Sequence, residues 1–290
     1  MKRLPLVTAL LVLWSTAAIS VTAQTAAAAG APKAAEFRRL GITFYESRQF
    51  ERAVQAFSDA VRLKPNYAEA YNDLGVAYSA LGRHEDAIQS LKRAIDIRPE
   101  YVEAICSLGS EYHQLGDLEK GIEYLQQAIL IKPDYTLALN NLGAVLRESG
   151  RTQEAVAVYR QAIRLQPQFA EAHRGLALAL YDQSDFEDTI KHLTEAVRLK
   201  PNYYEAYNNL GVAFYRQRQY TRSVAYFLRA IELNPEHAEA IYNLGVLRLE
   251  LKQRSDALAQ YHKLKTVNPN LANSLQGALY NGMILDLRNK

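Results

Sequence analysis

The 290-residue sequence has few of the residues that build disulfides and metal sites. Cys106 is its one cysteine, so no intramolecular disulfide can form. None of the six histidines stands near another histidine or Cys106 at a metal-binding spacing, and we expect no metal and no other cofactor. The glycines are not gathered into a phosphate-binding loop. These absences argue against metalloenzymes and nucleotide-dependent enzymes.

A surplus of charge of one sign is also missing. The chain has 34 lysines and arginines against 31 acidic residues, a formal net charge of +3. Without Lys2 and Arg3, 32 basic residues stand against 31 acidic ones. Nucleic acids and anionic lipids attract clustered cations, so we expect neither as a partner.

The start of the chain differs in composition from the rest. Lys2 and Arg3 precede an uncharged apolar run over residues 4–19, and small residues follow up to Ala23. This order is typical of a signal peptide, which we place at residues 1–23 with cleavage after Ala23. We therefore expect an exported protein, periplasmic or secreted. An uncleaved membrane anchor is the alternative, although a full span usually needs about 20 apolar residues.

Proline recurs with a strict period of 34 residues, at Pro65, Pro99, Pro133, Pro167, Pro201, Pro235 and Pro269. A fixed period of this length marks stacked supersecondary units. Each unit is taken to end two residues after its proline, which gives seven repeats: 34–67, 68–101, 102–135, 136–169, 170–203, 204–237 and 238–271. The alanine-rich residues 24–33 predict a flexible spacer before the repeats. Residues 272–290 predict a capping helix after them.

Apolar residues inside each repeat follow helical spacing. In the second repeat, Tyr71, Leu74 and Tyr78 form the stripe of one helix, and Leu91 belongs to the stripe of another. Glycine and alanine recur where two helix backbones would approach closely. Pro99 ends the second helix. The pattern predicts an all-α solenoid of helix-turn-helix units.

This 34-residue pattern resembles the tetratricopeptide repeat family. The resemblance is carried by glycine at position eight of six repeats and by a large apolar residue at position 24 of all seven: Gly41, Gly75, Gly109, Gly143, Gly211 and Gly245; Phe57, Leu91, Leu125, Tyr159, Leu193, Phe227 and Tyr261. It implies a right-handed superhelix whose first helices line a concave groove. It also implies a non-catalytic scaffold for protein-protein interaction.

Residues on the inner side of these first helices are the candidate peptide-binding site: Asn72, Asp73, Asn140, Asn141, Arg147, Arg174, Asn208, Asn209, Tyr215, Tyr242 and Asn243. Amide side chains offer donors and acceptors, so they can pair with a peptide backbone of any sequence. The alternative for the asparagines is that they are solvated residues of the repeat pattern. Five glutamates occupy position two, where the helix dipole favours a carboxylate, so the acidic surplus of this face does not by itself indicate a basic ligand.

The recurring Asn-Asn-Leu-Gly at 140–143 and 208–211 resembles the asparagine ladder in the repeats of O-linked N-acetylglucosamine transferases. In that family, asparagines at position six hold the main chain of a bound polypeptide. The resemblance implies this role for Asn141, Asn209 and Asn243. Arg39, Ser107 and Gly175 interrupt the ladder, and Asp73 only approximates it.

We therefore expect a non-catalytic scaffold that binds a partner protein or an extended peptide in its groove. The alternative is a membrane-tethered accessory subunit of an envelope assembly or glycosyltransferase complex. Self-association through the C-terminal helix is a third hypothesis, based on Met283, Leu285 and Leu287. His173 is expected to be a half-buried packing residue and Cys106 an inert, at least half-exposed thiol.

Overall fold

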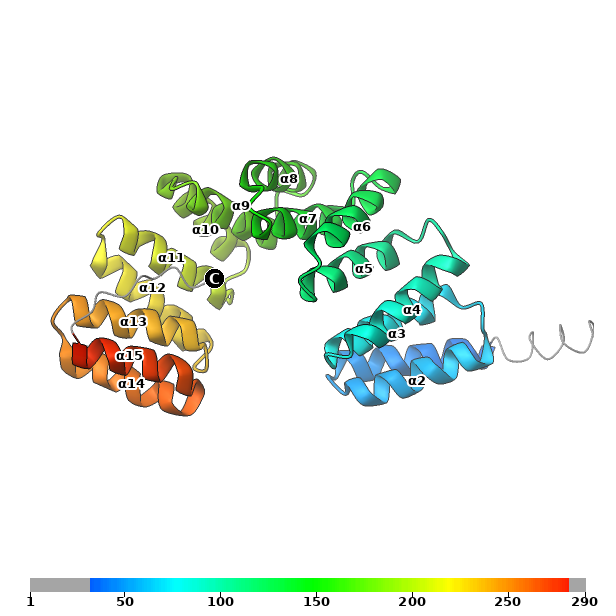
Figure 1. Cartoon of the computed structure of the whole chain (residues 1–290), viewed down its shortest axis with the longest axis horizontal. Helices are drawn as coiled ribbons and strands as arrows, with labels where there is room; N and C mark the ends of the chain where they lie inside the picture. The colour runs from blue at the N-terminus through cyan, green and yellow to red at the C-terminus, as the bar shows by residue number, and fades with distance from the viewer. Residues whose placement is uncertain (1–31, 282–290) are drawn as a thin grey trace, which may run out of the picture. The chain divides into compact units, whose positions relative to one another are not determined.

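The computed structural model describes residues 32–281. The expected signal peptide, most of the expected spacer and the residues after 281 lie outside the described residues. Within residues 32–281 the chain forms helices joined by short turns, and no strand occurs there (Figure 1). The all-α prediction is confirmed.

Every repeat contributes two helices. The first helices are residues 32–46, α3 (Ala68–Ala80), α5 (Val102–Gln114), α7 (Thr136–Glu148), α9 (Ala170–Asp182), α11 (Tyr204–Arg216) and α13 (Ala238–Glu250). The second helices are α2 (Phe50–Leu63), α4 (His84–Ile97), α6 (Leu118–Ile131), α8 (Thr152–Leu165), α10 (Phe186–Leu199), α12 (Tyr220–Leu233) and α14 (Arg254–Val267). One more helix, α15 (Pro269–Asn281), follows them.

The helices form two compact units, which divide after Pro133. In the first unit, α3 packs against α2 and α4 and also contacts α5, the first helix of the next repeat. In the second unit, α7 contacts α9 and α11 contacts α13 in the same way. Neighbouring repeats therefore stack as a solenoid, as the sequence predicts. The right-handed sense of the superhelix stays a prediction.

The close approach of paired helices depends on glycine at position eight. A Cβ atom at Gly75 would lie 2.7 Å from Cγ of Leu91, and one at Gly211 would lie 2.5 Å from the Phe227 ring. Carbon atoms do not approach so closely, so the position-24 side chain occupies the volume that any other residue at position eight would need. Leu91 and Phe227 are buried as a result.

In the turn between the two helices, the residue at position 15 of each repeat has left-handed backbone angles. The glycines Gly82, Gly116 and Gly150 have φ of 70°, 78° and 80°, and Arg48, Ser184, Arg218 and Lys252 take the same conformation with φ of 58–64°. In the second repeat, Arg83 N donates to the Tyr78 carbonyl at 2.9 Å, the hydrogen bond of a Schellman motif. Four repeats thus keep the turn geometry without glycine.

We predict that Arg218→Gly stabilises the protein by about 0.5–1 kcal/mol. The left-handed conformation costs a non-glycine residue about 1–2 kcal/mol, and the greater freedom of glycine in the unfolded state offsets part of the gain. Urea denaturation followed by circular dichroism measures the change. Gly116→Ala is the control and should destabilise, since a Cβ at Gly116 meets no atom within 4 Å and only the backbone is affected. A less stable Arg218→Gly variant would contradict this account.

The recurring prolines end the second helices. Helix α4 stops at Ile97, and Arg98, directly before Pro99, has φ −136° and ψ 93°. The Cδ atom of the proline ring clashes with the preceding residue when that residue has helical angles, which explains the extended conformation of Arg98.

Pro269 likewise follows the end of a second helix, since α14 stops at Val267 and Asn268 has φ −151° and ψ 94°. It differs from the other prolines in that a helix also begins there: α15 starts at Pro269 instead of the expected residue 272. Proline is tolerated in the first turn, where its missing N–H would have no partner.

Helix α15 caps the last repeat with an apolar face. Leu275 and Leu279 are buried in a cluster with Ile241 and Val246 of α13. Leu275 lies 2.5 Å from the place where a Cβ of Gly245 would stand. The capping helix therefore covers the glycine that the position-24 side chain covers in other repeats.

Candidate functional site: a polar pocket on the first helices

Polar side chains on neighbouring first helices are joined across a step of 35 residues, which is one repeat plus one residue. Near the start of the helices, Arg38 Nε donates to Asp73 Oδ2 at 2.6 Å and Asn243 Nδ2 donates to Asn208 Oδ1 at 3.0 Å. Near their ends, the same step joins Arg147 to Asp182, Arg216 to Tyr181 and Tyr215 to Glu250. Several predicted groove residues thus hold neighbouring repeats in register.

In the first unit, the predicted site residues Asn72 and Asp73 take part in this packing. Asp73 is bound by Arg38, and Asn72 Nδ2 lies 3.5 Å from Asp73 Oδ1. Burial raises the pKa of the Asp73 carboxyl, and Arg38 opposes the rise. Neither residue lines the pocket described below.

Three predicted residues of the second unit also lie outside the pocket lining. Asn140 Nδ2 donates to Asn141 Oδ1 at 3.3 Å within α7. The Tyr215 hydroxyl donates to Glu250 Oε1 at 2.5 Å. Burial and this hydrogen bond raise the pKa of Tyr215. The structure thus gives Asn140, Asn141 and Tyr215 intramolecular partners.

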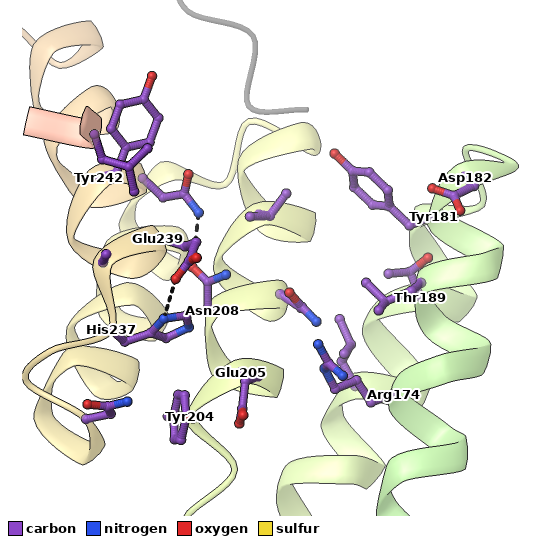
Figure 2. A pocket seen from close by; sticks show the side chains of 18 of the residues that line it. Arg174, Tyr181, Asp182, Thr189, Tyr204, Glu205, Asn208, His237, Glu239 and Tyr242 are labelled. Atoms are coloured by element: carbon purple, nitrogen blue, oxygen red, sulfur yellow. Dashed lines mark hydrogen bonds and ion pairs between the residues drawn. The ribbon is translucent and has the colours of Figure 1, made fainter. Parts of the chain in front are cut away.

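The other six predicted residues meet at one pocket of about 810 Å³ in the second unit: Arg147, Arg174, Asn208, Asn209, Tyr242 and Asn243. Figure 2 shows Arg174, Tyr181 and Asp182 of α9 on one side and His237 and Glu239 on the other. Glu205 and Asn208 of α11 lie between them. The volume is in the range of pockets that hold ligands.

Three buried polar atoms of the lining lack a hydrogen-bond partner: Arg174 Nε, Asn209 Nδ2 and His237 Nε2. His237 Nδ1 lies 2.8 Å from Glu239 Oε2, so in the neutral ring Nδ1–H donates and Nε2 is left as an acceptor. An unpaired buried polar group costs about 1–3 kcal/mol. A ligand that supplies one acceptor for each donor and a donor for His237 would recover this cost.

The three asparagines of the pocket lining, Asn208, Asn209 and Asn243, have different roles. Asn208 and Asn243 are each 8% exposed and bond to one another, which leaves little of either amide for a ligand. Asn209 is the member of the expected ladder whose amide nitrogen is unpaired in the pocket. Of these three amides, those of Asn208 and Asn243 join neighbouring helices, and that of Asn209 is available to a ligand.

The sequence analysis did not predict the lining residues at and just before the starts of α11 and α13, above all Tyr204, Glu236 and His237. The Tyr204 and His237 rings meet edge to face with centroids 5.0 Å apart. A signal was present, because His237 is the one histidine at a position where the other repeats have tyrosine, phenylalanine or leucine. A departure from a repeat's own pattern can mark a surface under a different constraint.

The interruption of the ladder at Gly175 has a packing cause. A Cβ at Gly175 would lie 2.3 Å from Cε1 of Tyr159, and one at Gly143 would lie 2.7 Å from Cζ of the same ring. Tyr159 is 3% exposed, and burial raises its pKa to about 12. The ring fills the space between two first helices, so repeat five has no room for the asparagine of the ladder.

We predict that Gly175→Asn destabilises the protein by about 1–3 kcal/mol through overpacking against Tyr159. At position 24, which Tyr159 occupies, repeats two, three and five have leucine. Tyr159→Leu should therefore remove the clash and make Gly175→Asn less costly. A double-mutant cycle from urea denaturation measures the coupling. Additive effects of the two substitutions would contradict the proposed contact.

A histidine pair lies in repeat five. His173 Nε2 lies 3.1 Å from the Pro167 carbonyl, which places its proton there, and His173 Nδ1 accepts from His192 Nδ1 at 3.1 Å. His173 is 7% exposed, so the expected packing role holds with deeper burial than the half-buried state predicted. Burial, then the neighbouring His173, lower the pKa of His192; Lys191 and Arg160 act in the same direction and Asp188 opposes them.

We predict that acid weakens the fold through His192. The unfolded state takes up a proton near pH 6.5, and the folded state does so only at lower pH, so stability is full above about pH 6.5 and is lost as the pH falls below it. His192→Tyr, which copies Tyr124 and Tyr226 of repeats three and six, should lose less melting temperature than the parent between about pH 7.5 and 5.5. Exposed His262→Tyr should behave like the parent. Equal losses in all three proteins would refute the assignment.

Cys106 differs from its prediction. It is 2% exposed, whereas the sequence predicted a thiol at least half exposed. The prediction was wrong because stacking of the repeats encloses this position of the first helix: at the same place in repeats six and seven, Asn208 and Tyr242 are also buried. Within residues 32–281, no group of three histidine, cysteine, aspartate or glutamate side chains could hold a metal ion.

Sequence models of tetratricopeptide repeats match residues 38–102, 174–234 and 208–266. Two further repeat models match residues 143–184 and 102–135. The chain belongs to the tetratricopeptide repeat family. Proteins of this family are in general protein-protein interaction scaffolds and are typically non-catalytic.

Solved tetratricopeptide structures share the fold. Cut9–Hcn1 of the APC/C hetero-tetramer has a TM-score of 0.73 at 18% identity and covers 83% of the chain, which spans 48% of that protein's chain. A repeat protein from Parabacteroides merdae has a TM-score of 0.67 at 15% identity over 85% of the chain and 98% of its own. PilF of Pseudomonas aeruginosa has a TM-score of 0.62 at 22% identity over 72% and 96%. No curated protein is recognisably similar in sequence.

Proposed function

We propose that the protein is a non-catalytic scaffold whose second unit binds an extended polypeptide segment of a partner protein in the pocket on α9, α11 and α13. The observation that supports this most directly is the set of three unpaired buried atoms at one pocket: Arg174 Nε, Asn209 Nδ2 and His237 Nε2. Two are donors and the third is an acceptor.

A polypeptide main chain matches this set chemically. Its carbonyl oxygens accept hydrogen bonds and can pair with Arg174 and Asn209, and its N–H groups can donate to His237. The tyrosines of the lining offer amphipathic surface with few rotamers to lose, as is usual at binding surfaces. In this proposal Asn209 has the main-chain role that the transferase asparagine ladder implies, while Asn141 and Asn243 support the helices.

We also propose that the protein is exported and cleaved after Ala23. The apolar run over residues 4–19 is the support for this proposal. Separately, none of the helices within residues 32–281 is long and apolar enough to cross a membrane. A membrane-tethered accessory subunit is the second candidate, supported by the same apolar run if it stays attached. N-terminal sequencing distinguishes them, because Gln24 as first residue supports cleavage and retention of the leader supports tethering.

We predict that Arg174→Ala with Asn209→Ala weakens peptide binding about tenfold or more. Hydrogen bonds to charged groups contribute about 1.5–3 kcal/mol, and about 1.4 kcal/mol corresponds to a factor of ten. The full chain is used to select binders from random dodecapeptides displayed on phage. Fluorescence anisotropy then measures the affinity of the enriched peptides for each variant.

The matched control is Gln153→Ala with Arg164→Ala, which removes one amide and one guanidinium from exposed sites on α8. It should bind like the parent. The melting temperatures of all three proteins should agree within a few degrees. If the parent enriches no peptide, or if the pocket variant and the control bind equally well, the proposed function is wrong.

A further inference from the structure

Glutamates at position two have a cationic partner in two repeats. In repeat two, Arg98 at position 31 forms an ion pair with Glu69, and in repeat five Lys200 lies 2.9 Å from Glu171. Burial tends to raise the pKa of Glu171, but Lys200, together with a backbone hydrogen bond at the helix start and Arg174, lowers it. In these repeats the carboxylate therefore has an intramolecular role besides its place at the start of a helix.

The last two repeats have lost this partner. Position 31 holds Asn234 in repeat six and Asn268 in repeat seven. Among the residues that the structure describes, no lysine or arginine forms an ion pair with Glu205, Glu236 or Glu239, and Glu239 pairs with the imidazole of His237. Asn234 instead accepts a hydrogen bond from the backbone N–H of Glu236 at 3.1 Å, which shapes the turn before α13.

These carboxylates line the same pocket as the unpaired donors. The Arg147 guanidinium is neutralised by Asp182 at 3.0 Å, whereas Arg174 forms no ion pair among the described residues and lies over the Tyr203 ring, 5.7 Å from its centroid. Three carboxylates without lysine or arginine partners stand against it. The lining thus combines the donors Arg174 and Asn209 with the three carboxylates. Figure 2 shows Arg174 on the α9 side and Glu205 beside the Tyr204 ring.

We infer that the pocket selects extended segments that carry a lysine or arginine, an inference that rests on the proposed function. The basic side chain lies against Glu205, Glu236 and Glu239, and the Tyr204 ring offers a face to its cation. The neighbouring main-chain carbonyls pair with Arg174 and Asn209. The helix dipole explains why glutamate is favoured at position two, but it explains neither the loss of the position-31 cation nor the unpaired buried atoms beside these carboxylates.

An acidic segment suits the pocket less well. It could pair with Arg174, but it would bring its charge close to three carboxylates that have no cation of their own. The repulsion is strongest at Glu205, which is half-buried, whereas Glu236 and Glu239 are exposed and more strongly screened by solvent. Charge complementarity of this kind sets which partner is accepted.

The test compares dodecapeptide selection on the full chain with selection on the variant Glu205→Gln, Glu236→Gln, Glu239→Gln. The parent should enrich peptides that share a lysine or arginine. A synthetic peptide from that set should bind the variant at least about tenfold more weakly. The affinity for the parent should also fall as sodium chloride is raised, because the pairing is electrostatic.

The charge-matched control is Glu119→Gln, Glu123→Gln, Glu187→Gln, three exposed carboxylates outside the pocket. It should bind the same peptide within about twofold of the parent. Enriched peptides that depend on Arg174 and Asn209 but share no basic residue, or that bind the two glutamine variants equally, overturn this inference and leave the proposed function intact. A parent that enriches no peptide overturns both.

Discussion

The contact between a glycine on one helix and a large side chain on its partner sets the geometry of every repeat that contains it. Gly211 and Phe227 illustrate it, since the ring occupies the volume of the missing side chain. The distance between the paired helices follows from this contact, and that distance determines how the next pair stacks. Prolines and left-handed turns only define where the helices end. The polar surface of the first helices is therefore built on spacings that buried apolar contacts fix.

That spacing also decides which polar residues are available to a ligand. A step of 35 residues brings side chains of neighbouring first helices together. Asn243 bonds to Asn208 in this way, and Arg147 bonds to Asp182. Such residues stabilise the stack and at the same time define the wall of the pocket. Arg174 and Asn209 belong to the same surface and keep buried nitrogen atoms unpaired. On this face, a residue whose polar atoms bond to the neighbouring first helix serves packing, and a residue whose polar atoms stay unpaired is available to a ligand.

Contacts inside one repeat could be predicted from the sequence, because they recur with its period. The end of α4 before Pro99 and the turn at Gly82 are of this kind. Contacts between repeats could not, because they depend on how each pair of side chains fills one particular junction. The Asn208–Asn243 bond, the burial of Cys106 and the meeting of His237 with Glu239 need the stacked structure. Pro269 shows a further limit, since the residue type that ends the second helices also begins α15 here.

The ring of Tyr159 has a consequence for the modularity of the chain. Because it fills space at both Gly143 and Gly175, it belongs structurally to two successive repeats. Excising the fifth repeat so that the fourth meets the sixth would bring Asn209 to the place of Gly175, against the tyrosine. Repeats of identical length are therefore not freely interchangeable here, and duplication or deletion of a repeat at this junction requires a compensating substitution in one of the two repeats that then meet.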